Sequence, residues 1–207
     1  MKKLVYFFGN KQTEGDASQK YLLGGKGANL AEMSKLGIPV PPGFTISTEV
    51  CKSFNENNQK YPNTLEKEVA ANLEKLEKAT GKKFGDTKNP LLVSVRSGAA
   101  SSMPGMMDTI LNLGLSEKVV NSLASSTGNP RFAWDSYRRF IQMYGNVVEN
   151  IDHEKFEHVI EEIKDSRGIK EDTDMSAADW EEVVAGYKKL FKIEKNRNFP
   201  DDAKDQL

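Results

Sequence analysis

The stretch Leu22-Leu23-Gly24-Gly25-Lys26-Gly27-Ala28-Asn29-Leu30 decides how the first part of the chain is interpreted. Three glycines surround Lys26 at the point where a helical pattern begins. Free N–H groups at a helix start attract anions, and glycine lets a ligand approach the backbone closely. A lysine at this end opposes the helix dipole unless an anion lies beside it. The stretch therefore predicts a phosphate-binding turn, and the alternative is a glycine turn with a solvated lysine.

Neither common nucleotide-binding motif occurs at this turn. The sequence has no Gly-x-x-x-x-Gly-Lys-Ser/Thr here, and no Gly-x-Gly-x-x-Gly follows a strand. A second candidate covers residues 95–109, with the sequence VRSGAASSMPGMMDT. Arg96 leaves a strand into small residues there, which places a guanidinium fork beside a loop that can fold over phosphates. The alternative is a hairpin-like connection in which Arg96 pairs with a surface carboxylate.

Composition excludes several classes of function. The 207 residues carry a net charge of −1, so no global field draws the chain to nucleic acid or to an acidic membrane. Cys51 is the single cysteine, which excludes an internal disulfide and predicts a buried thiol in a reducing compartment. No apolar run reaches the roughly 18 residues that a membrane span needs. We therefore expect a soluble cytoplasmic protein with no membrane or nucleic-acid partner.

Hydrophobic periodicity predicts an α+β protein. A helix should follow the glycine turn and stop at Gly37, and the period of two puts Leu92, Ser94 and Arg96 on one face of a strand. The residue pair Asn129-Pro130 is a good helix start. Strands are expected over 4–8, 43–47, 91–97 and 107–114, and further helices from Thr48, over 65–80, from Asn129, over 153–166 and over 176–195. Gly81 should supply the left-handed end of the helix over 65–80, and Ser176 with Asp179 should form a capping box.

The expected organisation has three parts. Residues 1–128 form an α+β subdomain, residues 129–195 a helical subdomain, and residues 196–207 the start of a continuation. Within the second part, Phe132, Tyr137, Phe140 and Tyr144 should mark a buried helix face. His153 and His158 lie among Glu and Lys five residues apart, so we expect solvated helix residues there, not a metal pair.

Taken together, the two loops resemble the amino-terminal part of proteins of the pyruvate, phosphate dikinase family. The resemblance covers most of the chain. Gly-Gly-Lys-Gly and Pro-Pro-Gly-Phe are shared with phosphoenolpyruvate synthases, whereas the loop over residues 102–109 is typical of the dikinases. The matching segments are residues 23–33, 37–45, 94–98, 102–109, 111–114 and 137–145.

The resemblance implies the first part of an ATP-grasp nucleotide-binding domain with an appended helical subdomain. In this interpretation Lys26 and Arg96 are the catalytic contacts to the ATP phosphates, and Gly98 to Thr109 is the loop that covers them. The implied ATP-binding residues are Gly24, Gly25, Lys26, Gly27, Arg96, Ser97, Gly98, Ser101, Ser102, Met103, Gly105, Asp108 and Thr109.

The family reaction converts ATP, orthophosphate and pyruvate into AMP, diphosphate and phosphoenolpyruvate through a phosphohistidine on another domain. The resemblance implies that this histidine and the Mg²⁺ ligands lie outside the chain, so we expect no catalysis from it alone. The implied partners are the remaining ATP-grasp half, the phosphohistidine domain and a second copy in a homo-oligomer. Two alternatives stay open: a phosphoenolpyruvate synthase-like dikinase that uses water, and a non-catalytic module whose helices dock a partner.

Overall fold

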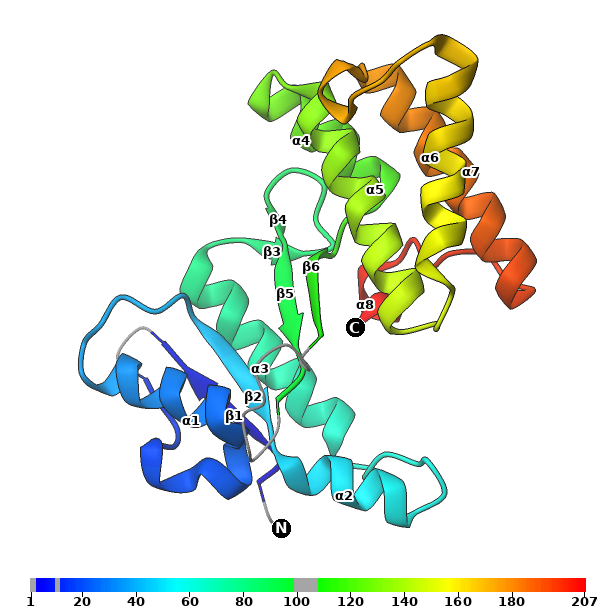
Figure 1. Ribbon diagram of the computed structural model, residues 1–207. Coiled ribbons are helices and arrows are strands. Elements are labelled where there is room, and N and C mark those ends of the chain that lie inside the picture. The colour runs from blue at the N-terminus through cyan, green and yellow to red at the C-terminus, as the bar shows by residue number, and fades with distance from the viewer. Residues whose placement is uncertain (1–2, 10–11, 99–107) are drawn as a thin grey trace. The chain divides into compact units, whose positions relative to one another are not determined.

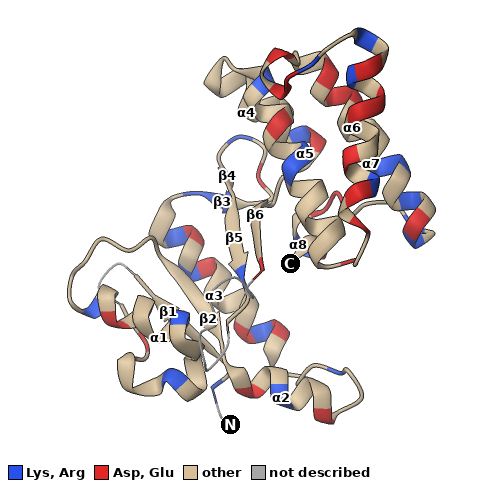
Figure 2. Cartoon of the chain, viewed as in Figure 1, with Lys and Arg blue, Asp and Glu red and all other residues tan. Residues whose placement is uncertain are grey.

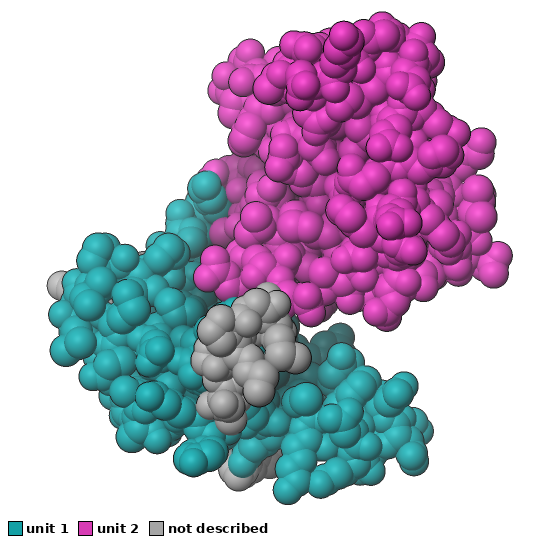
Figure 3. Space-filling model, viewed as in Figure 1, with its two compact units in different colours: residues 1–82, 97–107 teal, residues 83–96, 108–207 magenta. Residues whose placement is uncertain are grey.

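The computed structural model describes residues 3–9, 12–98 and 108–207 (Figure 1). The chain divides into two compact units, which Figure 3 colours separately. Unit 1 comprises residues 1–82 and 97–107, and unit 2 comprises residues 83–96 and 108–207. In the described part of the chain, no helix has the length and apolarity needed to cross a bilayer. The mixture of helices and strands confirms the predicted α+β class.

Two short antiparallel strands form the sheet of unit 1. Strand β1 (Val5–Phe8) pairs with β2 (Gly43–Ile46), so that Phe7 lies opposite Phe44. The ring of Phe8 leaves no room for a side chain at position 43, since a Cβ at Gly43 would lie 2.7 Å from that ring. The glycine of the Pro-Pro-Gly-Phe sequence is thus explained by packing within this strand pair.

Helix α1 (Lys20–Lys35) follows a short 3-10 turn, η1 (Ala17–Gln19). Its C-terminus is a Schellman motif, in which Ile38 N–H donates to Met33 O at 3.0 Å and Gly37 N–H to Ser34 O at 3.2 Å. Gly37 has a φ of 75°, the left-handed conformation that this ending requires. The predicted stop at Gly37 is therefore confirmed.

Helices α2 (Thr48–Glu56) and α3 (Leu65–Thr80) complete unit 1. The side chains of Leu4, Val5, Val50 and Leu65 form a buried cluster with contributions from Phe44 and Val69. Helix α3 ends at Gly81, whose φ of 67° is the predicted left-handed ending. One prediction in this region is wrong, because the Cys51 thiol on α2 is exposed.

Unit 2 begins with two strand pairs. Strands β3 (Lys83–Phe84) and β4 (Pro90–Leu91) are parallel, and β5 (Val93–Arg96) pairs antiparallel with β6 (Thr109–Leu113). The single strand predicted over residues 91–97 is therefore two strands separated at Leu92. The β5–β6 register shifts between Val93 and Val95, which indicates a bulge in this ribbon.

Helices form the rest of unit 2. They are α4 (Glu117–Thr127), α5 (Pro130–Val147), α6 (His153–Arg167), the 3-10 turn η2 (Asp172–Asp174), α7 (Ala177–Lys195) and α8 (Ala203–Gln206). The side chain of Asn129 accepts from Phe132 N–H, and Ser176 forms a capping box with Asp179, so both predicted helix starts are confirmed. Helix α4 was not predicted.

Aromatic side chains fill the core of this helical part. Tyr137, Phe140, Phe156, Tyr187 and Phe191 are fully buried. The predicted buried face of α5 is correct for Tyr137, Phe140 and Tyr144 but wrong for Phe132, whose side chain is 49% exposed.

One cation lies in the same core. Arg138 is 6% exposed, and its Nε donates to Asp135 Oδ1 at 2.8 Å. The guanidinium also lies 4.4 Å from the centre of the Trp180 ring and donates to Gln142 Oε1 at 3.3 Å. This buried charge is stabilised by a carboxylate, an amide and an aromatic face together.

Candidate functional site

Gly24 breaks the first helix within the predicted phosphate-binding turn. Its backbone has φ 69° and ψ 165°, which is not helical, so α1 consists of two helical segments joined by a kink. Only glycine adopts this conformation without strain. The prediction that the helix begins after the glycines is wrong, because the first segment starts at Lys20 and the second starts directly after Gly24 and includes Gly25 and Gly27.

Lys26 lies in the first turn of that second segment. Its Nζ is 3.4 Å from the carbonyl oxygen of Ser97, which also belongs to unit 1. This hydrogen bond is long and exposed, so it stabilises the lysine only weakly. The ammonium is therefore available to an anionic ligand at the N-terminus of a helical segment, where the dipole also favours negative charge.

Gly27 has a packing role next to Lys26. A Cβ at this position would lie 2.7 Å from Thr45 Cγ2 and 2.8 Å from Thr45 Oγ1 on β2. Helix α1 therefore approaches β2 more closely than any other residue type at position 27 would permit. The sequence predicts that this glycine lets a ligand approach the backbone. The structure shows that the glycine also lets the Thr45 side chain of β2 pack against the helix.

The second predicted cation, Arg96, lies at the end of the β5–β6 ribbon. Thr109 is its cross-strand partner, so two of the predicted phosphate-binding residues lie opposite one another in unit 2. The Nε of Arg96 donates to Ser94 Oγ at 3.4 Å. This contact confirms that Ser94 and Arg96 share one face of the strand.

The loop between these strands falls in part outside the described residues. Among the described residues, no heavy atom lies within 4 Å of the Cβ position of Gly98 apart from its chain neighbours. Ser97 joins the contact with Lys26. Predicted residues Ser101, Ser102, Met103 and Gly105 lie outside the described residues, and Asp108 is exposed and directly precedes β6.

The two histidines are surface residues of α6, as predicted. His153 pairs with Glu157 and His158 with Glu162, and the two imidazoles are 61% and 70% exposed. Acidic residues occur along the whole of this helix, and basic residues occur near its two ends (Figure 2). Across residues 3–9, 12–98 and 108–207, no three His, Cys, Asp or Glu side chains are arranged to hold a metal ion.

Comparison with known proteins assigns the family. The family described as "Pyruvate phosphate dikinase, AMP/ATP-binding domain" matches residues 20–63 and 57–170. The chain belongs to this family. The match includes both predicted cations, Lys26 and Arg96.

Three relatives show how far the likeness to pyruvate, phosphate dikinases extends. The chain is 53% identical to the pyruvate, phosphate dikinase of Rhizobium meliloti (strain 1021), with 100% of the chain and 23% of the relative covered. It is 51% identical to the chloroplastic pyruvate, phosphate dikinase 1 of Arabidopsis thaliana, with 99% and 21% covered. The corresponding values for the Clostridium symbiosum pyruvate, phosphate dikinase are 50%, 100% and 23%. The chain thus spans about a fifth of the length of the curated relatives it matches.

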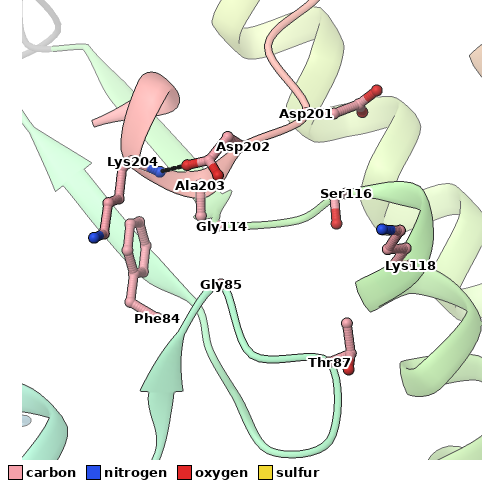
Figure 4. Close-up of a pocket in the computed structure, with 10 residues that line it drawn as sticks. All are labelled: Phe84, Gly85, Thr87, Gly114, Ser116, Lys118, Asp201, Asp202, Ala203 and Lys204. Carbon is pink, nitrogen blue, oxygen red and sulfur yellow. Dashed lines mark hydrogen bonds between the residues drawn. The ribbon is translucent and has the colours of Figure 1, made fainter.

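One pocket in unit 2 was not found from the sequence (Figure 4). It has a volume of about 270 Å³, and Lys118, Ser116, Thr87 and Asp202 are among its lining residues. Asp202 accepts from Lys204 N–H and so begins helix α8. The lining residues of the pocket between positions 84 and 118 lie within the part of the chain that the dikinase family matches. Those between positions 201 and 204 follow that part. The residues that line the pocket come from three separate segments of the chain, so no contiguous sequence motif marks them.

Proposed function

We propose that the chain is the amino-terminal, nucleotide-binding part of a pyruvate, phosphate dikinase, built as the first part of an ATP-grasp domain. The family assignment supports a binding site for ATP. At the residue level, the proposal rests on the position of Lys26. Its ammonium lies at the start of a helical segment and donates a hydrogen bond to the carbonyl oxygen of Ser97. Ser97 directly follows Arg96 in the chain.

In this proposal Lys26 and Arg96 hold the triphosphate of ATP. Phosphoryl transfer places charge on the phosphate oxygens, so positioning and charge stabilisation account for most of the catalysis. Arg96 supplies a planar fork of donors and does not lose its proton, so its role is electrostatic. Lys26 exchanges its weak bond to Ser97 O for a charged bond to phosphate. Gly24, Gly25 and Gly27, together with Ser97, Gly98, Asp108 and Thr109, would complete the phosphate-binding walls.

Mg²⁺ would neutralise charge on the transferring phosphoryl group. No described cluster of this chain fits the ion, so its ligands would come from another part of a longer enzyme. The proposed partners are therefore the remaining ATP-grasp half and a phosphohistidine domain, in a cytoplasmic homo-oligomer. The proposed reaction converts ATP, orthophosphate and pyruvate into AMP, diphosphate and phosphoenolpyruvate.

The test uses the full-length protein that contains this segment. A charged hydrogen bond contributes about 1.5–3 kcal/mol, so Lys26→Ala should lower kcat/KM for ATP by about ten- to a hundredfold. Lys20→Ala is the matched control, because it removes an exposed lysine from the same helix. Arg96→Ala should have an effect of similar size to Lys26→Ala.

Two results would contradict the proposal. Unchanged kcat/KM in both Lys26→Ala and Arg96→Ala would remove these residues from the site. Turnover of ATP and pyruvate without orthophosphate would replace the dikinase by the synthase-like enzyme that uses water.

A further inference from the structure

We infer that Thr45 is a positioning residue: its side chain sets the position of Lys26 through contact with the Gly27 backbone. This inference rests on the proposed function, because it concerns how the phosphate-binding lysine is held. Thr45 has no part in the family motif around Lys26 and lies in a different element, strand β2. The contact lies entirely within unit 1.

Gly27 occupies a helical position that alanine would favour. Gly27 lies inside α1 and has no left-handed backbone, so local conformation does not demand it. Glycine at such a position destabilises a helix by about 1 kcal/mol relative to alanine. The residue is also buried, within 2.8 Å of two Thr45 atoms measured from its Cβ position. Close packing against the strand is therefore the reason for glycine here.

Thr45 cannot move aside to make room for a side chain at position 27. Two of the three staggered positions on its Cβ face Gly27, and both hold heavy atoms, Cγ2 and Oγ1. Any rotation about χ1 leaves at least one heavy atom in those two positions. The Thr45 backbone is fixed as well, since it pairs with Tyr6 across the two strands.

Lys26 is close in the chain to the contact between Gly27 and Thr45. Lys26 directly precedes Gly27 and lies only two residues after the Gly24 kink. A Cβ at position 27 would have to push the start of this helical segment away from β2, since the strand side cannot yield. The backbone of Lys26 would move with it, and its ammonium would lose its place relative to Ser97 O.

The experiment measures kcat/KM for ATP in the full-length protein. Since misplacement by about 1 Å can cost up to about a hundredfold, Gly27→Ala should lower it by about tenfold. In a Thr45→Ala background, which removes both close atoms, the same substitution should cost less than about threefold. Thr45→Ile enlarges the opposite side of the contact and should act in the same direction as Gly27→Ala, which serves if Gly27→Ala does not fold.

A second cycle separates positioning from general destabilisation. If Gly27 acts through Lys26, adding Gly27→Ala to Lys26→Ala should cause no further loss of kcat/KM. Full additivity of the two losses, or a failure of Thr45→Ala to relieve the cost, would overturn the inference while leaving the proposed site intact. Unchanged kcat/KM in both Lys26→Ala and Arg96→Ala would instead overturn the proposed function.

Discussion

Asn129 shows how one side chain determines where a helix starts. Its Oδ1 accepts from Phe132 N–H at 3.0 Å, and Pro130 follows at the first helical position. Asn129→Ala should lower the free energy of unfolding by about 1 kcal/mol, because one N–H group at the start of α5 loses its partner. Urea unfolding measures the change.

Asn129→Asp is the control for this prediction, since a carboxylate accepts the same hydrogen bond. Equal stability of the alanine and aspartate variants would show that the cap contributes nothing measurable.

Residue-scale predictions from the sequence succeed where a residue type is required at its position by a single local interaction or backbone conformation. The caps at Asn129 and Ser176 and the left-handed Gly81 are correct, because their side chains or backbone conformations act locally. Cys51 and Phe132 are wrong, since exposure depends on which neighbours cover a helix face. The packing of Gly27 on Thr45 could not be predicted either, because these residues meet only in three dimensions.

Helix α6 packs closely on two other helices at glycines. A Cβ at Gly145 of α5 would lie 2.5 Å from the Phe156 ring, and one at Gly186 of α7 would lie 2.6 Å from Val159 Cγ1. Each glycine therefore lets a side chain of α6 approach a neighbouring backbone.

Gly145→Ala should destabilise unit 2 despite the better helix propensity of alanine. Overpacking costs about 1–3 kcal/mol, which exceeds the roughly 1 kcal/mol gained in propensity. The loss should be smaller in a Phe156→Leu background, because leucine lacks the distant ring atoms that meet the new methyl. Thermal unfolding of the four proteins in this cycle measures the coupling, and a stabilised Gly145→Ala single variant would contradict the packing argument.

Element-scale predictions depend on how strongly a segment is periodic. The segments over 65–80, 153–166 and 176–195 have clear apolar faces and form the predicted helices. Residues 91–97 look like one continuous strand, but a break at Leu92 divides them between β4 and β5. Helix α1 begins before its glycines because a helix can continue through a kink, and no local pattern distinguishes a kink from a start.

Alkaline conditions test the stability of unit 2 as a whole. Tyr137 is fully buried, and its hydroxyl donates to Asp201 Oδ1 at 2.9 Å. Burial, followed by the negative charge of Asp201, raises the pKa of this phenol far above its usual range. The unfolded chain loses the proton near pH 10, whereas the folded protein keeps it.

The free energy of unfolding should therefore fall as the pH rises above about 10. Tyr137 contributes a slope of up to about 1.4 kcal/mol per pH unit, because the folded state binds one more proton than the unfolded state. Tyr137→Phe should show a shallower fall than the wild type in urea unfolding between pH 9 and 11. Parallel curves for the two proteins would mean that this phenol ionises normally.

At the scale of the molecule, the sequence predicts the family but not the division of the chain. The motifs around Lys26 and Arg96 are sufficient for the family because they are contiguous in sequence. By contrast, the chain passes from one unit to the other between residues 82 and 83, 96 and 97, and 107 and 108, and no composition shift marks these points. The boundaries predicted after residues 128 and 195 stay predictions.

Gln206 has a practical consequence for anyone who trims this protein. Its buried side chain accepts from Gly114 N–H and donates to the carbonyl oxygens of Leu115 and Pro200, each at 2.9 Å. A recombinant boundary or a protease cut upstream of this glutamine would uncap the turn that joins β6 to α4. Expression trials that shorten the carboxyl end should therefore keep at least residue 206.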